Sequence, residues 1–111
     1  MTSATPFPFT GPEPMRRGIE AALQRVVDPE LALSIVDVGL VYGVTVTETQ
    51  VHVLLTMTSA ACPVADLIIE DIEAELDGVV PAGMTIRVEL TWAPPWSSDR
   101  MSEGAKRFMG W

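Results

Sequence analysis

The chain has 111 residues, near the usual size of a single domain, and its composition of 48% hydrophobic and 20% charged residues excludes a disordered chain. Its formal net charge is -8, from 15 acidic and 7 basic residues, so it would repel a phosphate backbone and we expect no nucleic-acid partner. No stretch approaches the roughly 20 apolar residues that cross a bilayer, and we therefore expect no membrane partner.

The first expected features along the chain are a tail and a helix. Residues 1–14 contain four prolines, which prevent a regular hydrogen-bonding pattern, so we expect a proline-rich tail before a single domain over residues 15–111. Apolar residues recur at helical spacing from Met15 onward and predict an amphipathic helix. This helix should end near Asp28, because Pro29 disfavours helical geometry in the residue before it.

The remaining pattern predicts three strands and two helices. Apolar residues alternate with smaller or polar ones over residues 40–46 and 51–57, which indicates a hairpin. A period of 3.6 residues returns over residues 65–77 and predicts the clearest helix. Alternation over residues 86–92 predicts a third strand, and we expect a last short helix over about residues 99–109.

These elements predict an α+β fold. Their order is α-β-β-α-β-α, and the simplest arrangement is a two-layer sandwich in which helices cover one face of a small three-stranded sheet. The second strand, the following helix and the third strand form a crossover if those strands are parallel, which makes the sheet mixed. The order of the strands stays open.

Cys62, the only cysteine, is the first candidate for chemistry. It directly precedes Pro63, and proline is favoured at the first position of a helix, so we expect Cys62 at the N-terminal cap. There the free backbone N–H groups and the helix dipole favour the thiolate, which is the form that attacks electrophiles and binds metals. The alternative is a small buried cysteine with a packing role.

The cysteine content also bears on location. A single cysteine has no partner for an internal disulfide and fits a reducing compartment. Residues 1–14 lack the basic and then apolar layout of a signal peptide. We therefore expect a cytoplasmic protein.

The chain offers few partners for the thiol. The only histidine, His52, precedes Thr58 by six residues along a predicted strand, which is roughly 20 Å at the usual rise of a strand. A cysteine hydrolase would therefore need a base from elsewhere, and His52 is expected to be a surface strand residue. A tetrahedral metal site would need further ligands from another subunit, a carboxylate or a small molecule.

Other polar and aromatic side chains are candidate binding residues. Thr58 and Ser59 bring hydroxyls to the loop before the cysteine, although hydroxyls at such turns commonly satisfy backbone groups. Asp28 and Glu30 place carboxylates in the loop after the first helix, where they either bind a cation or stabilise a turn. Trp96 follows two prolines, and an aromatic in such a rigid loop suits core closure or a recognition surface.

Five segments occur in an order and at spacings typical of one protein family. They are DPEL at 28–31, SIVDVGLVY at 34–42, TMT at 56–58, CP at 62–63 and WAPPW at 92–96. The chain resembles the family that includes the iron-sulfur assembly factor SufT and the phenylacetate-degradation protein PaaD. It is more similar to SufT, because PaaD-like members usually carry a C-terminal cysteine-rich segment and this chain ends at Trp111 without one.

The resemblance implies an α+β fold and a role in maturing iron-sulfur proteins. It implies that Cys62 is the family's cysteine and that Thr58 belongs to its threonine-rich loop. Asp28 and Glu30 would be its acidic pair, and all four residues would meet at one end of the sheet. The cargo would be iron or a transient iron-sulfur cluster, with no stable cofactor. The partners would be the assembly machinery and apo-iron-sulfur proteins.

Three functions stay open, and the resemblance favours the first, which is not enzymatic. A binding factor would use Cys62 to hold iron, a cluster or a partner's thiol, while the surface around Trp96 engages a scaffold or target. A thiol-dependent transferase or hydrolase would use Cys62 with Asp28 or Glu30. A structural adaptor, for example in a multicomponent oxygenase pathway such as phenylacetate degradation, would bury Cys62. We also expect a homodimer, because a symmetric pair supplies two thiols.

Overall fold

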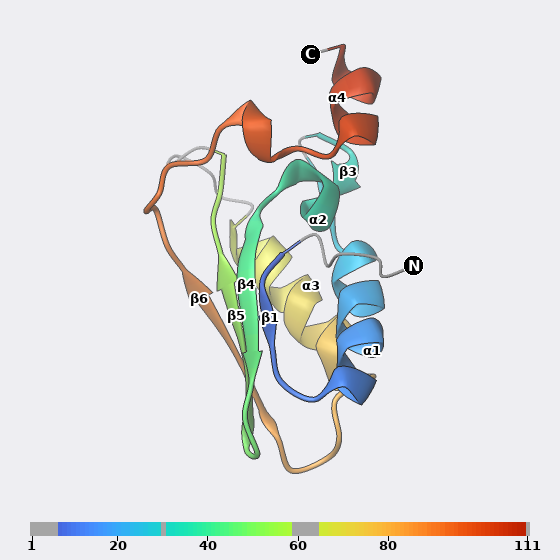
Figure 1. Cartoon of the computed structure of the whole chain (residues 1–111), viewed down its shortest axis with the longest axis vertical. Coiled ribbons are helices and arrows are strands. Elements are labelled where there is room, and N and C mark those ends of the chain that lie inside the picture. Colours follow the sequence, from blue (N-terminus) through green and yellow to red (C-terminus); the bar gives the residue numbers. More distant parts are fainter. Residues whose placement is uncertain (1–6, 30, 59–64, 111) are drawn as a thin grey trace.

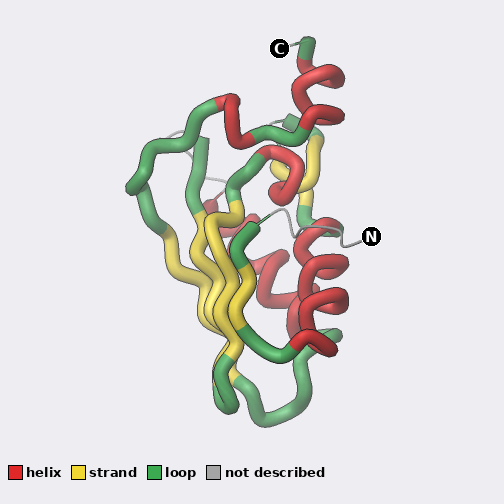
Figure 2. Tube along the Cα trace, in the orientation of Figure 1, coloured by secondary structure: helices red, strands yellow, loops and turns green. Residues whose placement is uncertain are grey.

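The computed structural model describes residues 7–29, 31–58 and 65–110, and it confirms the predicted α+β class. Helices α1 and α3 form one layer and pack on one face of a mixed sheet, which forms the other layer (Figures 1 and 2). No helix among the described residues is long and apolar enough to cross a membrane. The elements are β1 (Phe9–Thr10), α1 (Glu13–Gln24), β2 (Val27–Asp28), β3 (Leu33–Ser34), α2 (Ile35–Val38), β4 (Val41–Val46), β5 (Gln50–Leu55), α3 (Ala65–Asp77), β6 (Thr85–Leu90), the 3-10 turn η1 (Ser98–Arg100) and α4 (Glu103–Met109).

The main sheet has four strands in the order β1-β4-β5-β6, so the prediction of three strands is wrong by one. The additional strand, β1, pairs parallel with β4, and Val44 N–H donates to the Pro8 carbonyl at 2.9 Å. Phe7, just before β1, is buried at 4% exposure. Two residues among prolines are too few to show alternation, and the sequence pattern therefore did not reveal this strand.

The central part of the sheet agrees with the prediction. Strands β4 and β5 form an antiparallel hairpin, and β5 pairs parallel with β6 across α3, so the predicted crossover is present. Val51, Val53 and Leu55 on β5 are fully buried, and they face the helices. The buried side chains of α3 recur with a helical period at Ile68, Ile72 and Leu76, which closes the core against the sheet.

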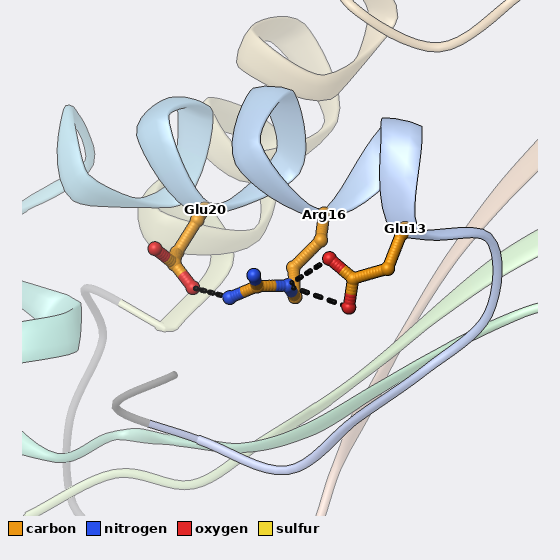
Figure 3. Close-up of polar contacts among 3 residues, drawn as sticks. All are labelled: Glu13, Arg16 and Glu20. Carbon is orange, nitrogen blue, oxygen red and sulfur yellow. Dashed lines mark hydrogen bonds and ion pairs between the residues drawn. The ribbon is translucent and has the colours of Figure 1, made fainter. Parts of the chain in front are cut away.

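Helix α1 starts and ends earlier than predicted. It begins at Glu13, because Pro14 fits within a first helical turn, whose N–H groups have no intrahelical partner. Arg16 joins Glu13 at 2.8 Å and Glu20 at 3.7 Å along the helix surface (Figure 3). The hydrogen bond that Arg16 donates to the Glu13 carboxylate raises the pKa of the Arg16 guanidinium. The helix ends at Gln24, well before Asp28.

The segment predicted as a loop contains three short elements. Strands β2 and β3 form a separate antiparallel pair, which lets the backbone of residues 27–28 bond to that of residues 33–34. Helix α2 follows directly, with the Ser34 hydroxyl accepting the Val36 N–H at 3.2 Å and with Gly39 in a left-handed conformation at its end. The sequence showed no periodicity here because each element is only two to four residues long.

The C-terminal segment is divided where one helix was predicted. The 3-10 turn η1 is followed by Met101, which is buried at 4% exposure, and only then by α4. The Ser102 hydroxyl caps α4 by accepting the Ala105 N–H at 3.1 Å. Strand β6 likewise ends at Leu90, before the predicted end at residue 92.

Candidate functional site

One end of the main sheet brings together segments that are far apart in the sequence. Thr56, directly after β5, donates its N–H to the Leu40 carbonyl at 2.8 Å. Leu40 donates to Ile35 at 2.9 Å, and Ile35 donates to Val26 at 2.9 Å. These three backbone hydrogen bonds connect the carboxyl end of β5 to α2 and then to the start of β2. The threonine-rich segment and the Asp28 segment therefore lie at the same end of the fold.

Asp28, one of the two predicted carboxylates, is buried at this end of the fold, with 2% of its surface exposed. It lies in β2, where it pairs with Leu33, and its main-chain carbonyl accepts hydrogen bonds from Leu31 at 3.2 Å and Ala32 at 2.8 Å. Ala32 takes a left-handed conformation with φ of 58°, which closes this turn. Asp28 is thus a buried acidic residue on a tight turn, whereas Glu30 lies outside the described residues.

The segment after β5 contributes a buried hydroxyl that the sequence analysis did not single out. Thr56 is fully buried, and its Oγ1 atom has no hydrogen-bond partner among the described residues. Buried polar atoms are usually paired, so a lone hydroxyl calls for an explanation. Met57 is buried too, while Thr58 is half-buried and ends the described part of this segment. The only signal for Thr56 was its place in the TMT motif.

Cys62 and Ser59 lie outside the described residues, as Glu30 does. The described chain stops at Thr58 and resumes at Ala65, the first residue of α3. The expected meeting of the cysteine with the acidic pair and the threonines therefore stays a prediction. The described residues place two of its members, Asp28 and Thr58, on segments at the same end of the sheet.

Trp96 lies at this end as well, and the structure gives it an internal contact. Its indole N–H donates to the Val38 carbonyl, the last residue of α2, at 2.8 Å, and its ring packs against the core. The Tyr42 hydroxyl donates to the Pro94 carbonyl at 2.7 Å. These two bonds attach the loop after β6 to α2 and β4. Trp92, which the analysis did not select, is the more exposed indole at 46%.

The C-terminal segment crosses the same end of the fold and approaches α2 closely. Ser102 donates its N–H to the Asp37 carbonyl at 2.8 Å. A Cβ on Gly39 would overlap the backbone of Arg100, so only glycine permits this approach. Arg100 in turn lies over the Tyr42 ring, 4.3 Å from its centroid.

A groove of about 510 Å³ lies between α1, α2 and η1. Its lining residues carry both signs of charge: Arg17 and Arg100 are basic, and Glu20 and Asp37 are acidic. Gln24 donates from Nε2 to the Asp37 carboxylate at 3.4 Å. Asp37 therefore faces this groove.

Neither the groove nor the rest of the described chain forms a metal centre. Among residues 7–29, 31–58 and 65–110, no three His, Cys, Asp or Glu side chains gather closely enough to hold an ion. His52 lies on β5 between the buried Val51 and Val53, so its side chain is on the sheet face away from the helices. There its Nε2 atom is 2.8 Å from Glu89 on β6.

Comparisons with known proteins agree on one family. Residues 16–90 match the family model described as iron-sulfur cluster assembly protein. The chain is 39% identical to the Fe-S protein maturation auxiliary factor YitW of Bacillus subtilis, over 88% of this chain and 96% of that protein. It is 40% identical to the Fe-S protein maturation auxiliary factor SufT of Staphylococcus aureus, over 77% of this chain and 97% of that protein.

The fold also agrees with a solved structure. A crystal structure of a domain of unknown function from Bacillus anthracis superposes with a TM-score of 0.81 at 42% identity, covering 88% of this chain and 93% of that one. The sequence match begins within α1, at Arg16, and ends with β6, at Leu90, so it includes every strand of the main sheet except β1. The chain therefore belongs to the iron-sulfur cluster assembly protein family.

Proposed function

We propose that this protein is an accessory factor in the maturation of iron-sulfur proteins, and that Cys62 transiently holds iron, a cluster or a partner's thiol. The observation that carries the proposal is the continuous family match over residues 16–90, a block that contains Asp28, Thr58 and Cys62. Two relatives that match over more than three quarters of this chain are named Fe-S protein maturation auxiliary factors.

The geometry around the sheet end supports a binding role. Asp28 and Thr56 are buried polar residues on segments that backbone hydrogen bonds join, and the chain leads from Thr56 towards Cys62. The sequence predicts Cys62, which directly precedes Pro63, at the N-terminal cap of a helix, where free N–H groups favour a thiolate. A thiolate is a suitable ligand for iron and for clusters.

One thiol per chain limits how iron is held. Iron-sulfur clusters are generally held by several cysteine thiolates, and this chain supplies one. Further ligands would come from a second copy of the chain, a carboxylate, a small molecule or the client protein. We therefore propose a homodimer and brief loading, with the assembly machinery and apo-iron-sulfur proteins as partners in the reducing cytoplasm.

Anaerobic reconstitution with iron and sulfide tests the role of Cys62. Wild type is compared with Cys62→Ser, which replaces the thiol by a hydroxyl of similar shape, and with Cys62→Ala, which removes the thiol and puts no polar atom in its place. Thermal unfolding confirms that all three proteins are folded. We expect visible absorption and bound iron in wild type only. Equal iron binding in all three proteins would contradict the proposal that the Cys62 thiol holds iron.

A further inference from the structure

Strand β6 is an open edge of the sheet. It is the last strand in the order β1-β4-β5-β6, and no described segment lies along its outer side (Figure 1). Thr85 and Thr91 donate their N–H groups to Thr49 and Leu55 on the β5 side. Because backbone groups alternate in direction along a strand, Ile86, Val88 and Leu90 direct theirs outward. An edge with three such residues is a template for another strand.

The side chains on this edge are incompletely covered. Ile86, Val88 and Leu90 lie opposite Val51, Val53 and Leu55 of β5 on the helix-covered face. The three β5 residues are fully buried, whereas their β6 partners are only partly buried. Trp92 continues the row and is 46% exposed. The helices therefore leave apolar surface along β6 that another strand would cover.

The charged side chains of β6 select a partner. Arg87 and Glu89 are exposed and lie on the opposite face, the one that carries His52. If a second β6 pairs antiparallel with Val88 opposite Val88, each Arg87 faces a Glu89 of the other copy. Shifting the pairing by two residues in either direction places Arg87 opposite Arg87 or Glu89 opposite Glu89. Like charges directly opposite each other oppose pairing, and opposite charges favour it.

We propose that β6 is the interface of a symmetric homodimer in which two β6 strands pair antiparallel about Val88 and continue the sheet from one chain into the other. Ile86 of one copy then exchanges hydrogen bonds with Leu90 of the other, and Val88 exchanges them with Val88. The same register brings each Trp92 opposite Met84 of the second copy, which covers the exposed indole. A second copy of the chain suits this edge because β6 itself carries both members of the charge pair, Arg87 and Glu89.

This inference rests on the dimer proposed above and assigns its interface. A symmetric contact uses the same patch on both chains, so each substitution acts twice. Two chains with a net charge of -8 repel at long range, and measurements therefore belong at physiological ionic strength, where that repulsion is screened beyond about 8 Å.

Charge exchange on β6 tests the interface in the full chain. Sedimentation and native mass spectrometry would measure dimer dissociation for wild type, Arg87→Glu, Glu89→Arg and the double variant. We expect a dimer in wild type and a dissociation constant raised about tenfold or more by each single change, because both charge pairs become repulsive. The double variant restores the pairs and should return to within about threefold of wild type. Arg107→Glu on α4 makes the same change of net charge as Arg87→Glu but lies away from β6, and it should leave the dimer unchanged.

Mixing the two single variants provides the decisive arm. Arg87→Glu and Glu89→Arg are complementary to each other, so the mixture should form a heterodimer that native mass spectrometry separates by mass. A wild type that is monomeric, a dimer that ignores the charge changes, or a mixture without heterodimer would each overturn the proposed interface. A monomer that binds an extended peptide of another protein along β6 would also overturn it.

Iron reconstitution separates this inference from the proposed function. Iron binding by a wild-type monomer would reject the interface and leave the Cys62 proposal standing. A β6 dimer without iron binding would support the interface and reject the carrier role of Cys62.

Discussion

The β5-α3-β6 unit forms part of the main sheet and its helical layer, and the C-terminal segment of residues 91–110 follows it along the chain. Different interactions hold these two regions in place. The unit is held by fully buried aliphatic side chains that follow the strand and helix periods. The C-terminal segment contributes few buried side chains, among them Met101, and single hydrogen bonds to backbone carbonyls, including Trp96 to Val38 and Ser102 to Asp37. A substitution of a buried side chain in the β5-α3-β6 unit should therefore lower the free energy of unfolding more than a single substitution in the C-terminal segment.

The largest expected effect comes from the core of the β5-α3-β6 unit. Leu76→Ala removes a fully buried side chain from α3 and should lower the free energy of unfolding by about 2 to 5 kcal/mol, because a cavity is left behind. Leu67→Ala on the same helix is the matched control, since Leu67 is 55% exposed and should cost less than about 1 kcal/mol. Urea unfolding of both variants measures the difference, and equal midpoints would contradict this description of the core.

The close approach of the C-terminal segment to α2 gives the next effect. Gly39→Ala should cost about 2 to 3 kcal/mol, because Gly39 has φ of 85° and a Cβ would overlap the Arg100 backbone. Gly83→Ala isolates the conformational part, since Gly83 has φ of 95° but open space around it, and about 1 kcal/mol is expected. Denaturant unfolding gives the loss of stability of each variant, and the extra loss in Gly39→Ala measures the cost of the overlap with Arg100. Identical losses of stability in the two variants would show that Arg100 of η1 does not lie in close contact with Gly39.

Trp96 tests the hydrogen bonds of the same segment. Trp96→Phe keeps an aromatic ring but removes the N–H that bonds to the Val38 carbonyl, at an expected cost of about 1 to 2 kcal/mol. Trp92→Phe makes the same change at an indole that is 46% exposed and should be nearly neutral. Chemical unfolding of the two variants measures the difference. A larger loss from Trp92→Phe would reverse the structural roles of the two indoles.

The smallest expected change in stability concerns Thr56. Thr56→Val replaces a buried hydroxyl that has no hydrogen-bond partner among the described residues, so stability should stay constant or rise by up to about 1 kcal/mol. Unfolding and iron reconstitution are measured on the same protein. Unchanged stability with reduced iron binding would indicate that the hydroxyl serves the site, whereas a large loss of stability would show that it is paired in solution.

The same contrast explains what the sequence predicted. Elements of six or more residues, such as β5 and α3, repeat a period often enough to be identified, and the crossover between β5 and β6 follows from their order. Strand β1 and the β2-β3 pair have two residues per strand, so their existence depends on partners that are distant in sequence. The break between η1 and α4 depends on burial of Met101, which local propensity does not encode.

The candidate site divides in the same way. The Asp28 turn and the threonine segment were predicted from residue type and motif, and both lie at one end of the sheet. The Thr56 hydroxyl, which has no hydrogen-bond partner in the part of the chain that the structure describes, and the contact of Trp96 with α2 follow from three-dimensional packing, which local sequence patterns do not reveal. Open edges such as β6 depend on strand order, and the sequence left that order open.

Complementation tests the central claim most directly. A strain that lacks this gene would express wild type, Cys62→Ala or Leu67→Ala, and the activity of an iron-sulfur enzyme would be measured together with the amount of each variant protein. The account predicts restored activity with wild type and the Leu67→Ala control, and loss with Cys62→Ala at equal protein level. Full restoration by Cys62→Ala would contradict the role of the thiol in iron-sulfur maturation.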